Sequence, residues 1–159
     1  MIAAWLVVLA PSVAAQAGRR LTEDDLVWKL SPVDADSAAV RRVLGAPRAR
    51  DVWFVAPSGE SAPRWSYGKY NIYYDISADG VIAIELTGRG PKTLRGLQVG
   101  DAADRVRALY GTPLLVTDEV PHPEGTEVWR YEGDVGAVTV TLRQRRVERI
   151  LLGSDFTGE

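Results

Sequence analysis

Two short stretches of the chain carry apolar residues at helical spacing between a capping residue and a glycine. One runs from Ser37 to Pro47 and the other from Asp101 to Pro113. Ser37 or Asp36 can cap the first predicted helix, and Asp101 can cap the second. Residues three or four positions apart share a helix face, which here holds Val40, Val43 and Leu44 in the first stretch and Val106, Leu109 and Tyr110 in the second. The glycine suits the left-handed residue that ends a helix, and the proline beyond it prevents continuation. Each stretch therefore predicts a short amphipathic helix.

Apolar and polar residues alternate over residues 70–76 and 137–142, which is typical of β-strands. Because successive strand side chains point to opposite faces, one face receives Ile72, Tyr74, Ile76, Val138, Val140 and Leu142, and the other receives Asn71, Tyr73, Asp75, Thr139 and Thr141. We expect the first set to face the core. Asp79-Gly80 and residues 144–146 predict hairpin turns, so the strands are expected to pair antiparallel.

Landmarks of the first half of the chain recur in the second half in the same order. Gly45 and Gly111 are 66 residues apart, Trp65 and Trp129 are 64 apart, and the β-branched runs that begin at Val81 and Val147 are again 66 apart. Such self-similarity predicts an internal duplication. The expected fold class is α+β, a tandem duplication of a short helix followed by antiparallel strands, with the helices packed on one face of the sheet. The expected repeats are residues 18–88 and 89–159.

Fourteen of the first 17 residues are apolar, none is charged, and the segment ends in Ala15-Gln16-Ala17, which matches a secretory signal peptide with its cleavage site. The apolar run is interrupted by Pro11 and is shorter than the roughly 18–20 residues that cross a bilayer. We therefore expect cleavage, export to the periplasm or the extracellular medium, and no membrane span in the mature chain. An uncleaved anchor is the alternative, and no basic residue precedes the apolar run.

Composition then removes several classes of function. The 159 residues hold 19 basic and 21 acidic side chains, a net charge of −2 that does not favour nucleic acid as a partner. The chain has no cysteine and one histidine, which excludes disulfides, thiolate nucleophiles and most metal and Ser-His-Asp sites. We expect no enzyme activity, no cofactor and no metal.

One acidic segment leaves two alternatives open. Residues 75–80, with Asp75, Ser77, Asp79 and Gly80, match the first half of a calcium loop, but Leu86 stands where the closing acid should be. A hairpin turn explains the same residues. A hydrolase that uses Asp75 and Asp79 as paired carboxylates is the rival from another functional class.

Aromatic residues on the polar side of the predicted sheet are the candidates for binding a partner. Exposed tyrosines on a rigid sheet offer a large contact area at low entropic cost. The candidate partner-binding residues are Lys69, Tyr70, Asn71, Tyr73, Asp75, Thr139 and Thr141. On this hypothesis Tyr73→Ala leaves the fold nearly intact, while Tyr74→Ala removes a core side chain. The alternative is that these tyrosines only cover the edges of the core, and the basic run Arg143–Arg149 is interpreted as a solvated hairpin tip.

The stretch from Leu94 to Pro113, with Gly100-Asp101 and Tyr110-Gly111-x-Pro113, resembles the SmpA/OmlA family of outer-membrane assembly lipoproteins. The duplication and the length also resemble the tandem-repeat β-lactamase inhibitory proteins. Gly18 and the absence of cysteine depart from both families, since one carries a lipidation cysteine and the other disulfides. Both families are non-enzymatic, so the resemblance implies no catalytic residue.

These observations together favour a non-enzymatic, exported, monomeric protein-binding module that recognises another envelope or extracellular protein. The alternative is an unanchored accessory factor in cell-envelope or outer-membrane maintenance. The partner is expected to be a protein, and the sequence leaves open whether it is a β-lactamase.

Overall fold

The computed structural model describes residues 20–32, 35–55, 60–75, 80–116 and 123–153, with the side chains of 53–55, 60, 75, 115 and 116 excepted. The predicted signal peptide, Ile76 and Asp79 lie outside these residues. In chain order the elements are the 3-10 helix η2 (Glu23–Leu26), α1 (Ser37–Leu44), β1 (Ala49–Val55), β2 (Glu60–Ser66), β3 (Tyr70–Asp75), β4 (Gly80–Leu86), α2 (Ala103–Tyr110), β5 (Leu114–Val116), β6 (Thr126–Glu132), β7 (Ala137–Arg143) and β8 (Arg146–Gly153).

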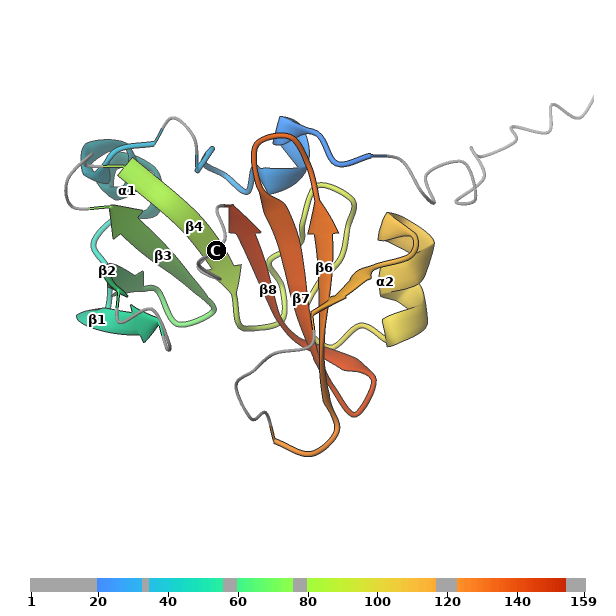
Figure 1. Ribbon diagram of the computed structural model, residues 1–159. Helices are drawn as coiled ribbons and strands as arrows, with labels where there is room; N and C mark the ends of the chain where they lie inside the picture. Colours follow the sequence, from blue (N-terminus) through green and yellow to red (C-terminus); the bar gives the residue numbers. More distant parts are fainter. Residues whose placement is uncertain (1–19, 33–34, 56–59, 76–79, 117–122, 154–159) are drawn as a thin grey trace, which may run out of the picture.

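The eight strands form one sheet in the order β1-β2-β3-β4-β8-β7-β6-β5 (Figure 1). Every neighbouring pair is antiparallel, as the sequence predicted. The chain returns to the middle of the sheet at its end, because β8 pairs with β4 rather than lying at an edge. The edges of the sheet are β1 and the three-residue β5.

The fold class expected from the sequence is wrong. The chain is strand-rich and organised by one sheet, and it is not a tandem duplication of a helix and strands with a helical layer on one face. Helices α1 and α2 have eight residues each and are therefore about 12 Å long, whereas eight strands extend over more than about 30 Å. Two such helices cannot cover the sheet, and Figure 1 places them near its two opposite ends.

One face of the sheet carries the core. A continuous row of buried side chains crosses six strands through cross-strand neighbours, in the order Trp65, Ile72, Ile84, Leu152, Val138 and Tyr131. The inward set predicted by alternation is confirmed for its described members, Ile72, Tyr74, Val138, Val140 and Leu142, which all belong to this core. Alternation thus identified the correct face.

Three short segments pack against parts of this core face. Val40 of α1 and Val106 of α2 are completely buried, and Leu26 of η2 is buried where η2 lies against β7 and β8. The predicted cap of α1 is present, because the Ala39 amide donates to Asp36 Oδ1 at 2.6 Å. Asp101 does not cap α2, and its Oδ2 instead accepts from the Gln98 amide at 3.0 Å. None of the helices in the described part of the chain is long and apolar enough to cross a membrane.

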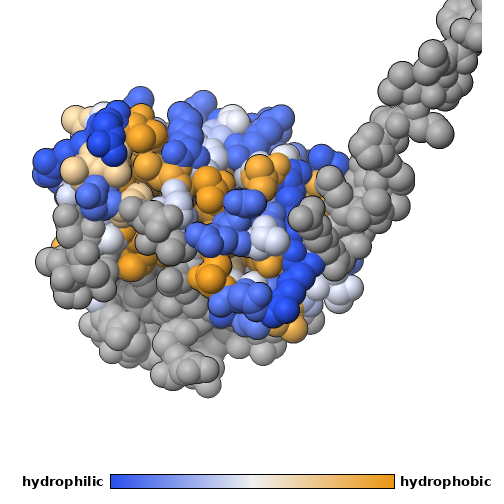
Figure 2. All heavy atoms as spheres, turned by 90° about the horizontal axis from the view of Figure 1, so that it is seen from above, coloured by the Kyte–Doolittle hydropathy of each residue, from blue (hydrophilic) through white to orange (hydrophobic). Residues whose placement is uncertain are grey.

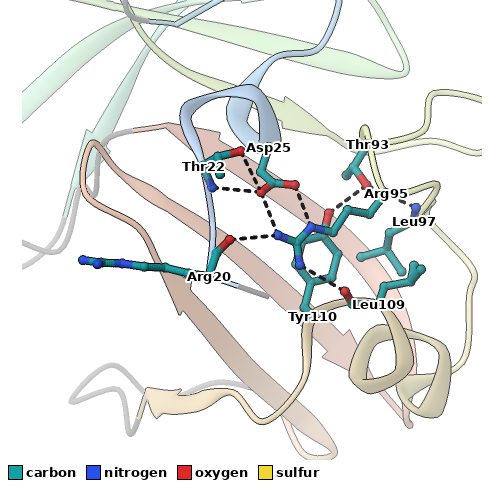
Figure 3. A network of polar contacts seen from close by, with 8 residues as sticks. All are labelled: Arg20, Thr22, Asp25, Thr93, Arg95, Leu97, Leu109 and Tyr110. Carbon is teal, nitrogen blue, oxygen red and sulfur yellow. Dashed lines mark hydrogen bonds and ion pairs between the residues drawn. The ribbon is translucent and has the colours of Figure 1, made fainter. Parts of the chain in front are cut away.

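A buried ion pair fastens the segment around η2 to the rest of the molecule (Figure 3). Arg95 donates from Nε to Asp25 Oδ1 at 2.6 Å and from Nη2 to Asp25 Oδ2 at 2.7 Å, and the two side chains are only 8% and 5% exposed. Arg95 Nη1 also donates to the Leu109 carbonyl at 3.1 Å, and the guanidinium lies 4.9 Å from the centre of the Tyr110 ring. One arginine therefore joins η2 to the last turn of α2.

The environment keeps the Asp25 carboxylate ionised. Burial raises the pKa of Asp25, but hydrogen bonds from Arg95 and from the Thr22 amide, at 2.9 Å, outweigh burial and hold this pKa below its ordinary value. A carboxyl group whose pKa is lowered by folding stabilises the native state above its unfolded pKa, near 3.9, and this contribution is lost as the pH falls through the folded pKa.

Asp25→Asn is expected to destabilise the fold by about 3–5 kcal/mol at pH 7, because it leaves the Arg95 charge buried without its partner. Urea unfolding measures this difference. The difference in unfolding free energy between wild type and Asp25→Asn should narrow as the pH is lowered below about 4, since the wild-type carboxyl then becomes neutral as well. A gap that stays constant from pH 7 to pH 3 would show that the charge of Asp25 does not stabilise the fold.

The turn between β7 and β8 has an unfavourable backbone. Gln144 and Arg145 both have positive φ, 49° and 59°, between the cross-strand pair Arg143 and Arg146. A two-residue hairpin of this kind favours Asn-Gly, because side chains other than glycine are strained in the left-handed region. The tip is nevertheless held in place, since the Gln144 amide donates to the Gly125 carbonyl and the Ala103 amide donates to the Arg145 carbonyl.

Arg145→Gly is therefore expected to stabilise the protein by about 0.5–1 kcal/mol, as the relieved strain exceeds the added freedom of the unfolded chain. The ion pair lost with Asp104 is exposed and contributes little. Arg143→Gly in the adjoining strand is the control and should destabilise. If Arg145→Gly and Arg143→Gly changed the melting temperature by the same amount, the proposed backbone strain at the turn would be contradicted.

Candidate functional site

The face of the sheet opposite the core, called here the second face, carries a polar network around Glu85. Glu85 belongs to β4 and is 5% exposed. Its Oε2 accepts from Asn71 Nδ2 at 2.7 Å and from the Tyr73 hydroxyl at 2.8 Å, and its Oε1 lies 3.4 Å from Arg149 Nη1. Arg149 Nε donates onward to Thr141 Oγ1 at 3.1 Å. The network thus joins β3, β4, β8 and β7.

A second ion pair continues this polar surface toward the β1 edge. Arg64 donates to both oxygens of Asp51 at 2.8 and 2.5 Å, and this hydrogen bonding raises the pKa of the Arg64 guanidinium and lowers that of Asp51. Burial and the neighbouring Glu85 carboxylate raise the pKa of Tyr73 well above that of a free phenol. Asp51 and Arg64 are therefore charged and Tyr73 is neutral at neutral pH.

The expected exposure of the second face is wrong for two of its residues. Tyr73 is 2% and Thr141 is 5% exposed, although both point away from the core as predicted. The small residues Ala62, Ala83 and Ala137 are buried on this face too. Alternation gives the face of the sheet on which a side chain lies, but it does not show whether that face is covered.

The seven predicted partner-binding residues do not form one surface. Asn71, Tyr73 and Thr141 belong to the Glu85 network, and Thr139 is half-buried beside Leu151. The side chain of Asp75 and the whole of Asp79, on which the calcium and hydrolase alternatives depend, lie outside the described residues. Lys69 and Tyr70 lie at the turn from β2 to β3, where a different cluster is found.

Five basic residues lie at the α1 end of the molecule, on segments that also carry or adjoin three aromatic rings. We call this cluster the arginine platform; it comprises Arg41, Arg42, Arg48, Arg50 and Lys69, with the rings of Trp65, Tyr67 and Tyr70. The five basic residues are all exposed, whereas Trp65 and Tyr67 are 8% exposed and Tyr70 is half-buried. Helix α1, strand β1 and the β2–β3 turn supply the cations, so the cluster depends on the tertiary fold.

The rings order the cations. Two guanidinium groups lie over the Trp65 ring, with Arg41 Cζ 5.0 Å and Arg50 Cζ 4.6 Å from its centre. Tyr67 and Tyr70 are stacked, with centres 5.1 Å apart and planes 16° from parallel. A contact between a cation and an aromatic ring contributes about 0.5–1 kcal/mol at exposed sites. The two arginines over Trp65 are therefore held against a rigid support.

Arg48, which directly precedes β1, lies against the β2–β3 turn that contains Lys69. Gly68 has a φ of 91°, which glycine adopts readily and other residues rarely do. A Cβ atom at this position would lie 2.9 Å from the Arg48 guanidinium, so glycine also leaves room for the arginine. The Lys69 side chain lies along Gly88. The backbone carbonyl of Lys69 accepts hydrogen bonds from the Thr87 and Gly88 amides at 2.8 and 3.0 Å. Burial raises the pKa of Tyr70, and nearby Arg48 opposes this shift.

The described residues of the platform carry positive charge without ion-paired negative charge. Within the described part of the chain, none of its five cations forms an ion pair with an acid, whereas arginines elsewhere do, among them Arg64, Arg95, Arg143 and Arg145. Four of these cations were not predicted as binding residues. A sequence signal existed, since residues 37–50 contain four arginines and no acid, but the sequence does not show that they converge with Lys69.

A hollow of about 410 Å³ lies at the other end of the sheet, and it offers no catalytic pair. It is lined by Arg20, Leu21, Tyr110, Thr112, Leu114, Arg130, Tyr131 and Glu132. Its carboxylate, Glu132, is ion-paired with Arg130 at 3.0 Å. Among the described residues, no group of three or more His, Cys, Asp or Glu side chains is placed to hold a metal ion.

Comparison with known proteins supports the fold alone. No family model matches the chain, and no curated protein matches it. Among solved structures it is similar to a DUF4309 family protein (YjgB) from Bacillus subtilis, with a TM-score of 0.55, 14% identity, and coverage of 82% of this chain and 85% of that chain. This similarity does not test the resemblance to the outer-membrane assembly lipoproteins or the β-lactamase inhibitory proteins.

Tyr73→Phe is expected to destabilise the protein by about 1–3 kcal/mol, because the buried Glu85 carboxylate loses a hydrogen-bond donor. Tyr73→Ala should cost about 3 kcal/mol or more, as truncations of buried aromatic residues do. Tyr70→Phe is the matched control, since no described residue forms a hydrogen bond with the Tyr70 hydroxyl, and it should be nearly neutral. Thermal melts that leave Tyr73→Phe as stable as Tyr70→Phe would contradict the role of the network.

Proposed function

We propose that this protein is a non-enzymatic, exported module that binds another envelope or extracellular protein. The observation that carries the proposal is the arginine platform, where Arg41 and Arg50 lie over the Trp65 ring and none of the five exposed cations forms an ion pair with an acid among the described residues. Arginine, tryptophan and tyrosine are the residues that most often dominate the energy of protein–protein interfaces. The platform therefore takes the place of the seven-residue surface expected from the sequence.

The distribution of charge also favours a macromolecular partner. The cations come from α1, from β1 and the residue before it, and from the β2–β3 turn, and none of them lines the 410 Å³ hollow. Small-molecule sites are concave and bury most of their ligand. A protein surface can contact several of these side chains at once.

Export remains part of the proposal and rests on residues 1–17 alone. The mature chain would begin near Gly18, and the ion-paired segment around η2 follows within a few residues. We propose that the mature protein is a monomer in the periplasm or outside the cell. A chain without cysteine is indifferent to the oxidising conditions of either compartment.

The proposal is tested with the mature chain as bait in an envelope extract of the organism that encodes it. We expect a captured protein that, once purified, rebinds the mature chain in a saturable 1:1 complex by calorimetry. The same preparation is screened for hydrolase activity. Turnover that Asp75→Asn abolishes would overturn the non-enzymatic function in favour of the paired-carboxylate rival.

A further inference from the structure

We propose that the arginine platform binds an acidic segment of the partner protein, one that presents glutamate or aspartate side chains beside small apolar ones. The inference rests on the proposed function and specifies the chemistry of the partner. It is carried by the placement of Arg41 and Arg50 on one ring, by the surrounding excess of positive charge and by two exposed valines.

The geometry suits carboxylates. A guanidinium group presents paired N–H donors that match the two oxygens of a carboxylate. Arg41 and Arg50 are already held within 5.0 and 4.6 Å of the Trp65 ring centre, so binding would immobilise them at a smaller entropic cost than free side chains. The guanidinium N–H groups of Arg41 and Arg50 are available to a ligand, because no described residue accepts a hydrogen bond from them.

The charge of this end contrasts with that of the whole chain. The protein has a net charge of −2, yet none of the five platform cations at this end is ion-paired with an acid in the described part of the chain. At physiological ionic strength, interactions between exposed charges fade beyond about 8 Å. An acidic segment must therefore contact the platform itself, and the negative charge elsewhere would repel it from the other end.

Two apolar side chains on the same elements indicate a peptide segment rather than a phosphate polymer. Val43 of α1 is 47% exposed and Val52 of β1 is 51% exposed. Figure 2 shows hydrophobic residues among strongly hydrophilic ones at this end of the molecule, on its left. Single-stranded nucleic acid stacks its bases on open aromatic faces, but Trp65 and Tyr67 are nearly buried and Trp65 is flanked by arginines.

Fluorescence anisotropy with a labelled peptide of Glu-Glu-Val-Gly repeats tests the inference on the mature chain. The peptide should bind wild type, and the matched Gln-Gln-Val-Gly peptide should not. Arg41→Gln with Arg50→Gln should weaken binding about tenfold or more, since two bidentate contacts are lost. Arg105→Gln with Arg143→Gln removes the same charge from exposed positions away from the platform and should change the affinity less than about twofold.

A second double variant distinguishes a loss of binding from a loss of the fold. Arg42→Gln with Arg48→Gln leaves both guanidinium groups on Trp65 and should weaken the same peptide severalfold in a protein that melts like wild type. The inference is overturned if the two platform variants bind like wild type, or if the control pair weakens binding equally. It is also overturned if polyphosphate or phosphatidylglycerol vesicles bind more tightly than the acidic peptide in the same assay.

The two proposals fail separately. A purified partner that binds the Arg41→Gln, Arg50→Gln variant as tightly as wild type would refute the acidic segment and leave the binding function standing. Platform-dependent binding of the acidic peptide, with no envelope protein rebinding the purified chain, would support the inference and refute the proposed function.

Discussion

The antiparallel pairing of β4 with β8 is the contact on which the rest of the structure depends. It joins four strands from each half of the chain into one sheet through the neighbours Ala83 to Gly153 and Leu86 to Ile150. A side chain at Gly153 would come within 2.4 Å of the Ile82 carbonyl oxygen, and its φ of 131° is one that other residues rarely adopt. Without this close approach, β4 and β8 would become exposed edges, and the continuous row of core residues would be divided.

Two kinds of charged group then have opposite roles. The Arg95–Asp25 pair is buried and fully hydrogen-bonded, so it fixes the segment around η2 over β7 and β8. The five cations at the α1 end are exposed and lack acidic partners among the described residues, so their attraction is available to another molecule. The Glu85 network lies between these extremes, because its charges and hydroxyl groups are used within the sheet.

The sequence predicted local structure well and the arrangement of surfaces poorly. Caps and turns depend on neighbouring residues, which is why Asp36 and the alternation around Ile72 and Val140 were predicted correctly. The fold class failed because periodicity locates a helix without showing how much of a sheet it covers. Tyr73 was placed on the correct face, but its burial depends on the Glu85 network, whose members are distant in sequence. The arginine platform was missed for a similar reason, since Arg41, Arg50 and Lys69 meet only after the strands pair.

Native-state hydrogen exchange tests most directly whether one cooperative sheet underlies this account. The amides of β2, β3 and β4 should open with the same free energy as those of β6, β7 and β8, because the β4–β8 ladder and the shared core row couple them. The amides within that ladder, such as those of Leu86 and Ile150, should be among the most protected. If the β1–β4 half exchanged with a clearly lower free energy than the β5–β8 half, the central role of the β4–β8 pairing would be contradicted.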